Sequence, residues 1–417
     1  METFFVLGSN HTLSIAEIGA VLGRDLDYSQ ASSEMLLLDN IEIGLDVLQE
    51  RLAGVIKTGQ IISSIPKWSL DELADLLFSH CYEYDRESRV NFGISVYDLN
   101  NSQLASQLQE KNKALGLEIK KRLKESDQSA RFVTGRDRAL SSVIVETNNL
   151  LESGGEFVLI ATKDGILIGQ TRTVQDFKAW SERDFGKPKR DPKRGMLPPK
   201  LARTMCNLAS GSDPVGTLLD PFCGIGTTLI EATLLGFKKL IGTDIDQKAI
   251  NDSNKNLNWL GREIDLELPD IHLLACPVEE IDSCLTTQEI VDAKHMVDLV
   301  ITEPDLGPPQ SGRETPQQLE NTLTELASLY IEGFRSMSKV LAKDAVVCIT
   351  FPVFELDKKK IFVPIMKELQ ELGYKVIDPV PTSVPKQLNI KTPQNGILYQ
   401  RPKHKVAREV LVFNYSP

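Results

Sequence analysis

Cysteine is scarce in this chain: its 417 residues include six cysteines, and these stand singly rather than in close pairs. Zinc sites and disulfide frameworks are built from closely spaced cysteines, so the spacing excludes both and predicts reduced thiols. The chain also lacks an apolar run approaching the roughly 20 residues of a membrane span. Its first residues show no basic leader followed by an apolar stretch. We therefore expect a soluble, cytoplasmic protein that does not enter a membrane.

Positive charge is in deficit overall, with a formal net charge of -11. This argues against a protein that coats nucleic acid indiscriminately, because phosphate binding is largely electrostatic. Three stretches are nonetheless basic. Residues 111–138 hold nine Lys or Arg against four acids, residues 178–203 hold nine against three, and residues 401–408 hold four and no acid. An ordinary solvated face explains any one of them, whereas three on an acidic chain favour a local basic surface.

The first half of the chain predicts small α+β units, because 417 residues are too many for one core. In residues 1–60 we expect strands at 4–8 and 35–39 and helices at 44–54 and at 14–23, the latter capped by Ser14. Residues 61–170 predict a mixed sheet with two helices. Its expected helices are 69–84 and 115–126, and its expected strands are 91–98, 131–135, 141–147, 157–162 and 166–171. Residues 171–200 are rich in Pro, Gly and charge, and they predict a linker.

The second half alternates strands and helices regularly from residue 217 onward. Strands separated by helices of this length predict a parallel sheet with helices on both faces. We expect strands at 216–220, 239–244, 271–275, 297–302, 345–350 and 374–380, with helices at 227–235, 247–260, 315–341 and 358–373. Two last strands, around 396–400 and 409–413, have no helix between them and predict an antiparallel hairpin at one edge.

The strongest local motif is LDPFCGIGTT, residues 219–228, which follows a strand and opens a helix. Its glycines let the backbone turn tightly and approach a ligand. The motif lacks the third glycine of a dinucleotide fingerprint and the Lys-Ser/Thr ending of a P-loop. We therefore expect the ligand to be a nucleoside without phosphates. A purely structural turn is the alternative. The residues that we assign to cofactor binding here are Asp220, Pro221, Cys223, Gly224, Gly226 and Thr227.

The next strand ends in GTDID, about twenty residues after the glycine motif. A carboxylate at that place holds ribose hydroxyls in folds of this kind, so we assign Asp244 to the ribose. Asp246 is expected to cap the following helix, and Ile245 to press on the adenine ring. Two helix caps without a ligand are the alternative.

The strand 298–301 runs into TEPDLGPP, residues 302–309. Substrates bind at the carboxyl ends of strands in open α/β sheets. Glu303, Asp305 and the carbonyls beside the prolines place several hydrogen-bond acceptors close together, which suits an amino group that must be held and made nucleophilic. A Pro-rich connection ending in a helix cap is the alternative.

Together these motifs resemble the class I methyltransferases that modify exocyclic amines. With the preceding MLPPKLARTMCNLAS, the chain is similar to the THUMP-domain tRNA guanosine N2-methyltransferases. The resemblance covers nearly the whole chain. It implies an α/β architecture: a ferredoxin-like α+β segment at 1–60, a THUMP-like RNA-binding module at 61–170, a linker at 171–200 and a Rossmann-like methyltransferase domain at 201–417.

The resemblance also implies S-adenosylmethionine as the cofactor, tRNA as the partner, and no metal. It places the catalytic loop at Glu303, Pro304, Asp305 and Leu306, where the family reads Asp-Pro-Pro-aromatic-Gly. Glu303 and the Pro304 carbonyl would hold the amine hydrogens of a flipped guanine. The family's third strand ends in an Asp that binds the adenine amine; here Cys276 lies in that segment, and we assign it to cofactor binding.

Two other functions fit parts of the pattern. A catalytically silent RNA-binding protein that kept the fold is favoured by Asp305, Leu306 and Cys276, which depart from the family pattern. A DNA amino-methyltransferase is disfavoured by the THUMP-like module. The sequence leaves open which nucleotide is modified, whether one or two methyl groups are added, and whether a small activator subunit takes part.

Overall fold

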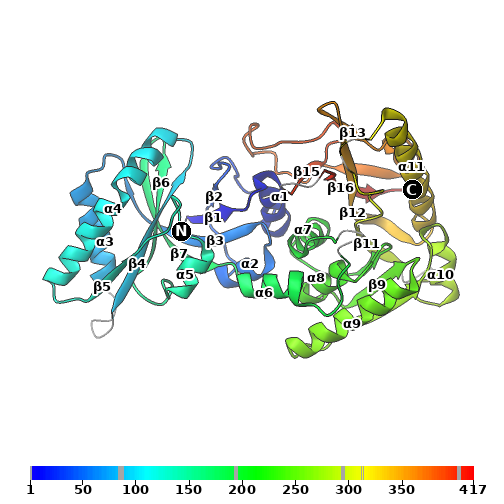
Figure 1. Ribbon diagram of the computed structural model, residues 1–417, viewed down its shortest axis with the longest axis horizontal. Helices are drawn as coiled ribbons and strands as arrows, with labels where there is room; N and C mark the ends of the chain where they lie inside the picture. Colours follow the sequence, from blue (N-terminus) through cyan, green and yellow to red (C-terminus); the bar gives the residue numbers. More distant parts are fainter. Residues whose placement is uncertain are drawn as a thin grey trace. The chain divides into compact units, whose positions relative to one another are not determined.

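A computed structural model of the chain describes residues 2–82, 89–191, 196–292, 296–310, 312, 314–401 and 405–417. Two compact units share these residues (Figure 1). The first comprises Met1–Ile15, Asp25–Lys178 and Pro381–Asn389, and the second comprises Ala16–Arg24, Ala179–Val380 and Ile390–Pro417. Within the described ranges, no helix combines the length and apolar character needed to cross a membrane.

The first unit is built on a seven-stranded sheet in the order β2-β1-β3-β7-β6-β4-β5. Its pairs are antiparallel except β4 with β5 and β4 with β6. The mixed sheet expected for residues 61–170 is present, but it also contains β1 and β2 of the segment 1–60, and the subdivision expected between residues 60 and 61 falls inside β3. The strands are β1 (Thr3–Leu7), β2 (Met35–Leu38), β3 (Val55–Ile65), β4 (Val90–Asp98), β5 (Ala130–Val133), β6 (Gly155–Thr162) and β7 (Gly165–Val174).

Two long helices of this unit, α3 (Leu70–Tyr82) and α4 (Ser102–Glu125), pack side by side against the sheet (Figure 1). Their apolar stripes meet alternate residues of the strands, so that Leu77, Ile119 and Phe92 share one buried core. A second, smaller core contains side chains from β1, β2 and β6. The other helices of this half are α1 (His11–Leu22), α2 (Leu45–Arg51), α5 (Ser142–Thr147) and α6 (Phe177–Ser181).

Two expectations for this half are wrong. Residues 141–147 form helix α5 rather than a strand, because the Ser141 side chain accepts from the Ile144 N–H and Val145 is buried. Packing and capping here override the β-branched composition. Helix α1 begins before Ser14: Asn10 accepts from the Leu13 N–H at 3.1 Å, and the Ser14 hydroxyl donates back to the Asn10 carbonyl.

The second unit contains a nine-stranded sheet whose path runs β10-β9-β8-β11-β12-β16-β14, with β13 on β12 and β15 on β16. The first five strands of the path are parallel, and β16 is antiparallel to its neighbours. The strands are β8 (Thr217–Asp220), β9 (Lys239–Asp244), β10 (Asp270–Ala275), β11 (Val297–Thr302), β12 (Leu341–Leu356), β13 (Lys359–Phe362), β14 (Tyr374–Ile377), β15 (Ile397–Tyr399) and β16 (Ala407–Tyr415).

Helices cover both faces of this sheet, as expected for parallel strands joined by crossovers. The first group, α7, α8 and α9, packs against β9–β12, whereas buried side chains of the second group share a core with buried side chains of β8, β9 and β11. The first group is α7 (Pro199–Ser210), α8 (Thr227–Leu235) and α9 (Gln247–Glu263). The second is α10 (Ile281–Thr287), α11 (Pro316–Met337) and α12 (Met366–Glu371).

The single helix expected at 358–373 is wrong in its first half. Asp357 and Lys358 both have positive φ, 49° and 63°, and they join β12 to β13 in a two-residue hairpin that pairs Leu356 with Lys359. This turn matches the twist of antiparallel strands, so the chain reverses instead of coiling. Helix α12 occupies only the second half. The stretch 171–200 contains α6 and a single π-helical turn, Glu182–Gly186.

Candidate active site

The site lies where the strand order of the second sheet reverses. Strand β8 lies between β9 and β11, and the chain builds the sheet outward from β8 first on one side and then on the other. Such a reversal leaves a crevice at the carboxyl ends of the strands, because the loops on either side run in opposite directions. Asp220, Asp244 and Thr302 are the last residues of the three strands concerned.

The loop after β8 is held open by two glycines. Gly224 and Gly226 have φ of 53° and 83°, in the left-handed region that L side chains rarely adopt. A Cβ at Gly226 would lie 2.4 Å from the Ser253 hydroxyl, whereas one at Gly224 would meet nothing closer than 4.0 Å. Gly226 therefore serves the close packing of α8 on α9, and Gly224 leaves its backbone accessible to a ligand.

The end of β9 is organised by the Asp244 carboxylate. One oxygen accepts from the Gly224 N–H at 3.0 Å, and the other accepts from the Asp246 N–H at 2.9 Å. A carboxylate has about four lone-pair sites, so two acceptor positions remain for hydroxyl groups. Asp246 caps α9 by accepting from the Lys248 N–H, as expected. Ile245 is 77% exposed, which leaves its apolar surface available for packing on a ligand.

Asp220 lies buried below this loop, with 2% of its surface exposed. It accepts from the Thr302 hydroxyl at 2.6 Å and from the Phe222 N–H at 3.2 Å. Burial raises the pKa of Asp220 to about 7, and the hydrogen bonds from Thr302 and Thr228 only partly offset that effect. The carboxyl therefore changes its charge near neutral pH.

The loop after β11 places Glu303 in the crevice, whereas Pro304, Asp305 and Leu306 are not among its lining residues. Pro304 is buried and Asp305 is exposed. The Asp305 carboxylate accepts from the Gly307 N–H at 3.0 Å, and its carbonyl accepts from the Tyr330 hydroxyl. Asp305 therefore closes a local turn, which leaves Glu303 as the carboxylate of this loop that faces the cavity.

One cavity collects six of the residues that the sequence assigns to the site: Asp220, Cys223, Gly224, Thr227, Asp244 and Glu303. Its other lining residues are Asp191, Met196, Leu197, Phe222, Ile225, Thr228, Asp246, Lys248, Ala249 and Asp252. The remaining assigned residues are outside this lining: Pro221, Gly226, Ile245, Cys276, Pro304, Asp305 and Leu306. Within the described lining, six carboxyl groups face a single cation, Lys248.

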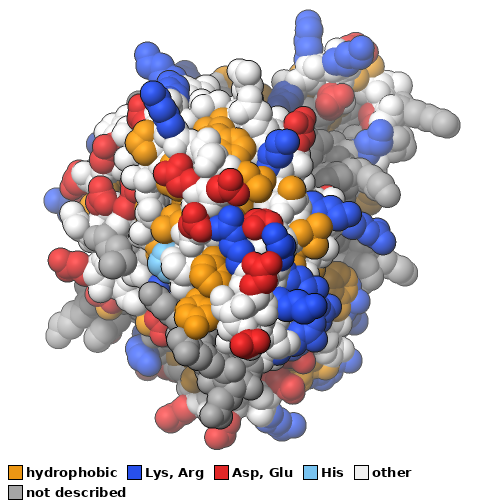
Figure 2. All heavy atoms as spheres, turned by 90° about the vertical axis from the view of Figure 1, so that its left-hand side faces the viewer, with side chains coloured by type: hydrophobic (Ala, Val, Ile, Leu, Met, Phe, Trp, Pro, Cys, Tyr) orange, Lys and Arg blue, Asp and Glu red, His pale blue; other side chains and the backbone are white. Residues whose placement is uncertain are grey.

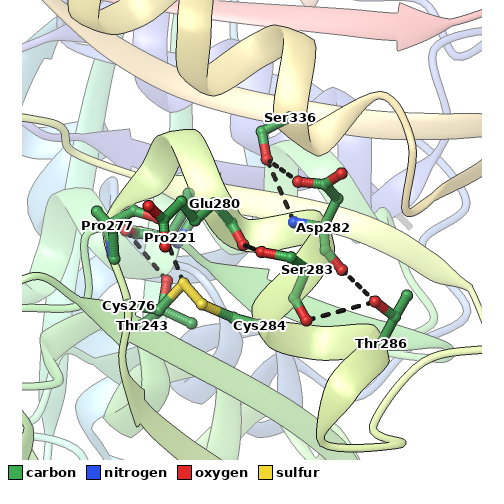
Figure 3. The surroundings of a disulfide bond; sticks show 10 residues. All are labelled: Pro221, Thr243, Cys276, Pro277, Glu280, Asp282, Ser283, Cys284, Thr286 and Ser336. Carbon is green, nitrogen blue, oxygen red and sulfur yellow. Dashed lines mark hydrogen bonds between the residues drawn. A yellow bond between two sulfur atoms is a disulfide. The ribbon is translucent and has the colours of Figure 1, made fainter.

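Cys276 is joined to Cys284 of α10 by a disulfide, so the expectation of six reduced thiols is wrong for these two (Figure 3). They are eight residues apart, and the chain turns back after β10 so that their Cα atoms lie 6.5 Å apart. Spacing alone could not show this return. Cys276 touches the site through its backbone: its N–H donates to the Asp244 carbonyl at 3.0 Å. The other four cysteines are free and buried.

The stretch expected to be a linker also contacts the loop between β8 and α8. Lys187 is only 3% exposed and donates to the Thr227 hydroxyl at 3.0 Å. Burial lowers the pKa of Lys187 to about 8. The Asn256 side chain donates to the carbonyls of Lys189 and Ile225 at 3.1 and 2.9 Å, which ties the stretch to the loop. The composition of residues 171–200 is typical of a linker, so nothing in the sequence indicated that Lys187 is buried.

Arg408 belongs by sequence to the basic stretch 401–408, yet it is buried and ion-paired with Glu303. Residues 402–404 of that stretch, like residues 192–195 of the second one, lie outside the described residues. Arg183 and Arg203 are also ion-paired, both with the buried carboxylate of Glu231. Part of the positive charge expected on a surface is therefore neutralised inside the second unit.

Known proteins resemble this chain in sequence and in fold. The UPF0020 family, an RMKL-like methyltransferase domain, matches residues 188–355. A tRNA (guanine(10)-N2)-dimethyltransferase of Methanothermobacter thermautotrophicus is 31% identical over 158 residues, which are 38% of this chain and 39% of that protein. The match thus spans about two fifths of that relative's length. TrmN from Thermus thermophilus shares the fold, with a TM-score of 0.56 over 100% of both chains at 14% identity.

A more complete match is the probable tRNA (guanine(10)-N2)-dimethyltransferase of Methanothermococcus thermolithotrophicus. It is 32% identical over 127 residues, which cover 30% of this chain and 72% of that protein. The matched segment is thus most of the relative's length. The chain belongs to the methyltransferase family that includes these tRNA (guanine(10)-N2)-dimethyltransferases.

Proposed function

We propose that this protein transfers a methyl group from S-adenosylmethionine to the exocyclic N2 of a guanosine in tRNA. The observation that carries the proposal is the acidic cavity at the strand reversal of a methyltransferase fold. The names of its relatives supply the acceptor: the matched proteins are tRNA guanine N2-dimethyltransferases.

The charge of the cavity fits this cofactor. S-adenosylmethionine carries a sulfonium and an ammonium group and no phosphate. The cavity lining favours it because Asp220 and Asp244 are in no ion pair among the described residues. Glu303 is already in an ion pair with Arg408, and Asp252 with Lys248 and Lys255. The same lining disfavours a dinucleotide, whose two phosphates need N–H groups and cations. Asp244 would accept from the ribose hydroxyls through its remaining lone pairs, Ile245 would pack on the adenine, and Asp220 would face the ammonium group.

When bound, the cofactor supplies an electrophilic methyl group. The chain must hold the acceptor amine in line with it and receive the amine hydrogens. Guanine N2 is a weak nucleophile because its lone pair is delocalised into the ring. Glu303 and the Pro304 carbonyl would accept its two hydrogens and favour the pyramidal nitrogen of the transition state.

The first unit is proposed to bind tRNA through a THUMP-like module. Acidic and basic side chains are intermixed over the centre of the face in Figure 2, and basic ones gather at its right side. Arg122 is bound by Asp71, Asp75 and Glu118, so it is engaged within the protein. Among the described residues of 111–138, Lys120, Lys124 and Arg131 are exposed without an ion-pair partner, which leaves them available to phosphates.

Methyl transfer to total tRNA from methylation-deficient cells tests the proposal, with nucleoside mass spectrometry to identify the product. We expect N2-methylguanosine or its dimethyl form. Calorimetry with S-adenosylmethionine should show binding to the unaltered protein. Asp244→Ala should weaken that binding at least about tenfold, since it removes hydrogen bonds to a charged acceptor. Equal binding to both proteins would remove Asp244 from the site.

The competing function is an RNA-binding protein without activity. It is favoured by the Glu303–Arg408 ion pair, which occupies part of the proposed acceptor carboxylate, and by Cys276, which is held in a disulfide rather than presented to a ligand. This alternative predicts tRNA binding without methylated product at any protein concentration. Radiolabelled methyl transfer beside a filter-binding measurement separates the two functions.

A further inference from the structure

The Glu303 carboxylate is fixed by a guanidinium from another strand of the sheet. Arg408 donates through Nε to Oε2 and through Nη2 to Oε1, the latter at 3.0 Å. The two side chains are 7% and 11% exposed. Such a bidentate pair sets the plane and direction of the carboxylate as well as its charge.

The strand that carries Arg408 leaves it little freedom. Strand β16 lies between β12 and β15, so that Arg408 is opposite Pro352 on one side and Tyr399 on the other. Thr350 of β12 donates its hydroxyl to Glu303 Oε2 at 3.3 Å. The carboxylate is thus anchored from two adjacent strands, and the β11 loop does not by itself decide where it lies.

These hydrogen bonds use the two oxygens unequally. Oε2 accepts from Arg408 Nε and from Thr350, whereas Arg408 Nη2 is the one donor to Oε1 among the residues that the structure describes. Each carboxylate oxygen has about two lone-pair sites, so Oε1 keeps one for an outside donor. Glu303 lines the cavity together with Asp220 and Asp244, which places such a donor beside the proposed cofactor site.

We propose that Arg408 is a positioning residue that aims Glu303 Oε1 at the acceptor amine; this rests on the function proposed above. In the transfer, the amine nitrogen bonds to the methyl carbon and the carbon–sulfur bond breaks with its electron pair left on sulfur. An amine proton then leaves to water. Because Arg408 binds both oxygens of its carboxylate, Glu303 acts as a fixed hydrogen-bond acceptor during this step, and the proton passes to water.

The ion pair with Arg408 also explains why this chain has a glutamate at position 303, where the family that it resembles has an aspartate. The extra methylene is what lets the carboxylate reach the Arg408 guanidinium across the sheet. Glu303→Asp shortens the side chain, so we expect it to break the ion pair and lower kcat rather than restore the family's geometry.

A double-mutant cycle in kcat tests the role of Arg408, with Glu303→Gln, Arg408→Met and the double variant assayed on methylation-deficient tRNA. We expect Arg408→Met to lower kcat about 100-fold through misplacement of the acceptor. The KM for the cofactor should change far less. If Arg408 acts through Glu303, the double variant is no slower than Glu303→Gln alone. Arg408→Lys, which keeps the charge, should recover part of the activity.

Controls separate this role from folding. The double variant removes both charges, so it avoids an unpaired buried ion, and calorimetry with S-adenosylmethionine reports whether its cofactor site is intact. Lys359→Met removes an exposed cation from the same sheet and should leave kcat unchanged. An unaltered kcat in Arg408→Met, or multiplicative losses in the double variant, overturns the inference alone. An unaltered chain that methylates no tRNA overturns the proposed function and this role with it.

Discussion

The Thr302 hydroxyl donates to the buried carboxylate of Asp220 at 2.6 Å, which joins the ends of β11 and β8. The residue after Thr302 is Glu303. Thr302 therefore links Asp220, which is proposed to face the cofactor, to Glu303, which is proposed to hold the acceptor amine. A change at Thr302 is therefore expected to reach the cofactor site without touching the cofactor.

Thr302→Val removes the hydroxyl and keeps the shape of the side chain. The pKa of Asp220, already raised to about 7 by burial, should rise further because one hydrogen bond to the ionised form is removed. Binding of a cofactor with an ammonium group should weaken about tenfold at pH 7. It should recover toward pH 8.5, where Asp220 is again ionised. Calorimetry at both pH values measures this, and Thr302→Ser, which keeps the hydroxyl, should bind normally at both.

The pH dependence of stability should report the same carboxyl. Asp220 titrates near 7 in the folded protein and near the ordinary value of about 3.9 when unfolded, so the folded state holds the proton more tightly between these values. Its contribution to stability is present below about pH 4 and is lost as pH rises through 7. The free energy of unfolding should fall by up to about 1.4 kcal/mol per pH unit in that window.

Asp220→Asn cannot titrate, so its free energy of unfolding should fall less steeply between pH 4 and 7 in denaturant titrations. Burial also raises the pKa of Glu409 to about 7, and Glu409 contributes in the same window. The test therefore compares how steeply the free energy of unfolding falls with pH in the two proteins. Some fall is expected in Asp220→Asn as well, because Glu409 still titrates there. Identical slopes would show that Asp220 does not change its charge there.

The sequence predicted the parallel half of the fold well because strands and helices there repeat with clear periods. It also indicated the crevice, since Asp220 and Asp244 end two of the predicted parallel strands and Glu303 directly follows a third. The carboxyl ends of neighbouring parallel strands necessarily meet at one edge. These three carboxylates do line a common cavity.

What the sequence could not show are interactions that depend on long-range register. Arg408 reaches Glu303 across 105 residues because β16 inserts antiparallel beside β12. Basic composition around Arg408 indicated a surface instead. Residues 141–147 were predicted as a strand from their β-branched composition, but the cap at Ser141 starts a helix there. Residues 358–362 were predicted as part of a helix, but the positive φ angles of Asp357 and Lys358 turn the chain into a hairpin.

The Cys276–Cys284 disulfide should stabilise the second unit. Cross-linking residues eight apart removes loop entropy from the unfolded chain, and this is worth about 2 to 3 kcal/mol for a loop of this size. Cys284→Ser should lower the free energy of unfolding by that amount in denaturant titrations without reductant. With dithiothreitol present the two proteins should become alike. A variant as stable as the oxidised unaltered protein would show that the two thiols are not bonded.

Binding of tRNA should depend on exposed lysines and arginines of the first unit and not on Arg122. Charge reversal at Lys120, Lys124 and Arg131 removes cations that have no ion-pair partner among the described residues. The slope of log affinity against log salt should therefore become shallower by about one for each phosphate that the variant no longer binds. Arg122→Glu breaks the ion pairs with acidic residues of α3. It should leave the salt slope unchanged, because Arg122 is already neutralised within the protein.

Filter binding of tRNA to the full chain from about 50 to 200 mM salt measures these slopes. The triple variant and Arg122→Glu form a matched comparison, since both replace positive charge on or beside α4 and only the first replaces cations that are free to bind phosphate. Equal slopes for the unaltered chain and the triple variant would assign Lys120, Lys124 and Arg131 to an ordinary solvated face. A reduced slope in Arg122→Glu alone would instead place the RNA over the α3–α4 ion pairs, because RNA phosphates would then have to displace the carboxylates that hold Arg122.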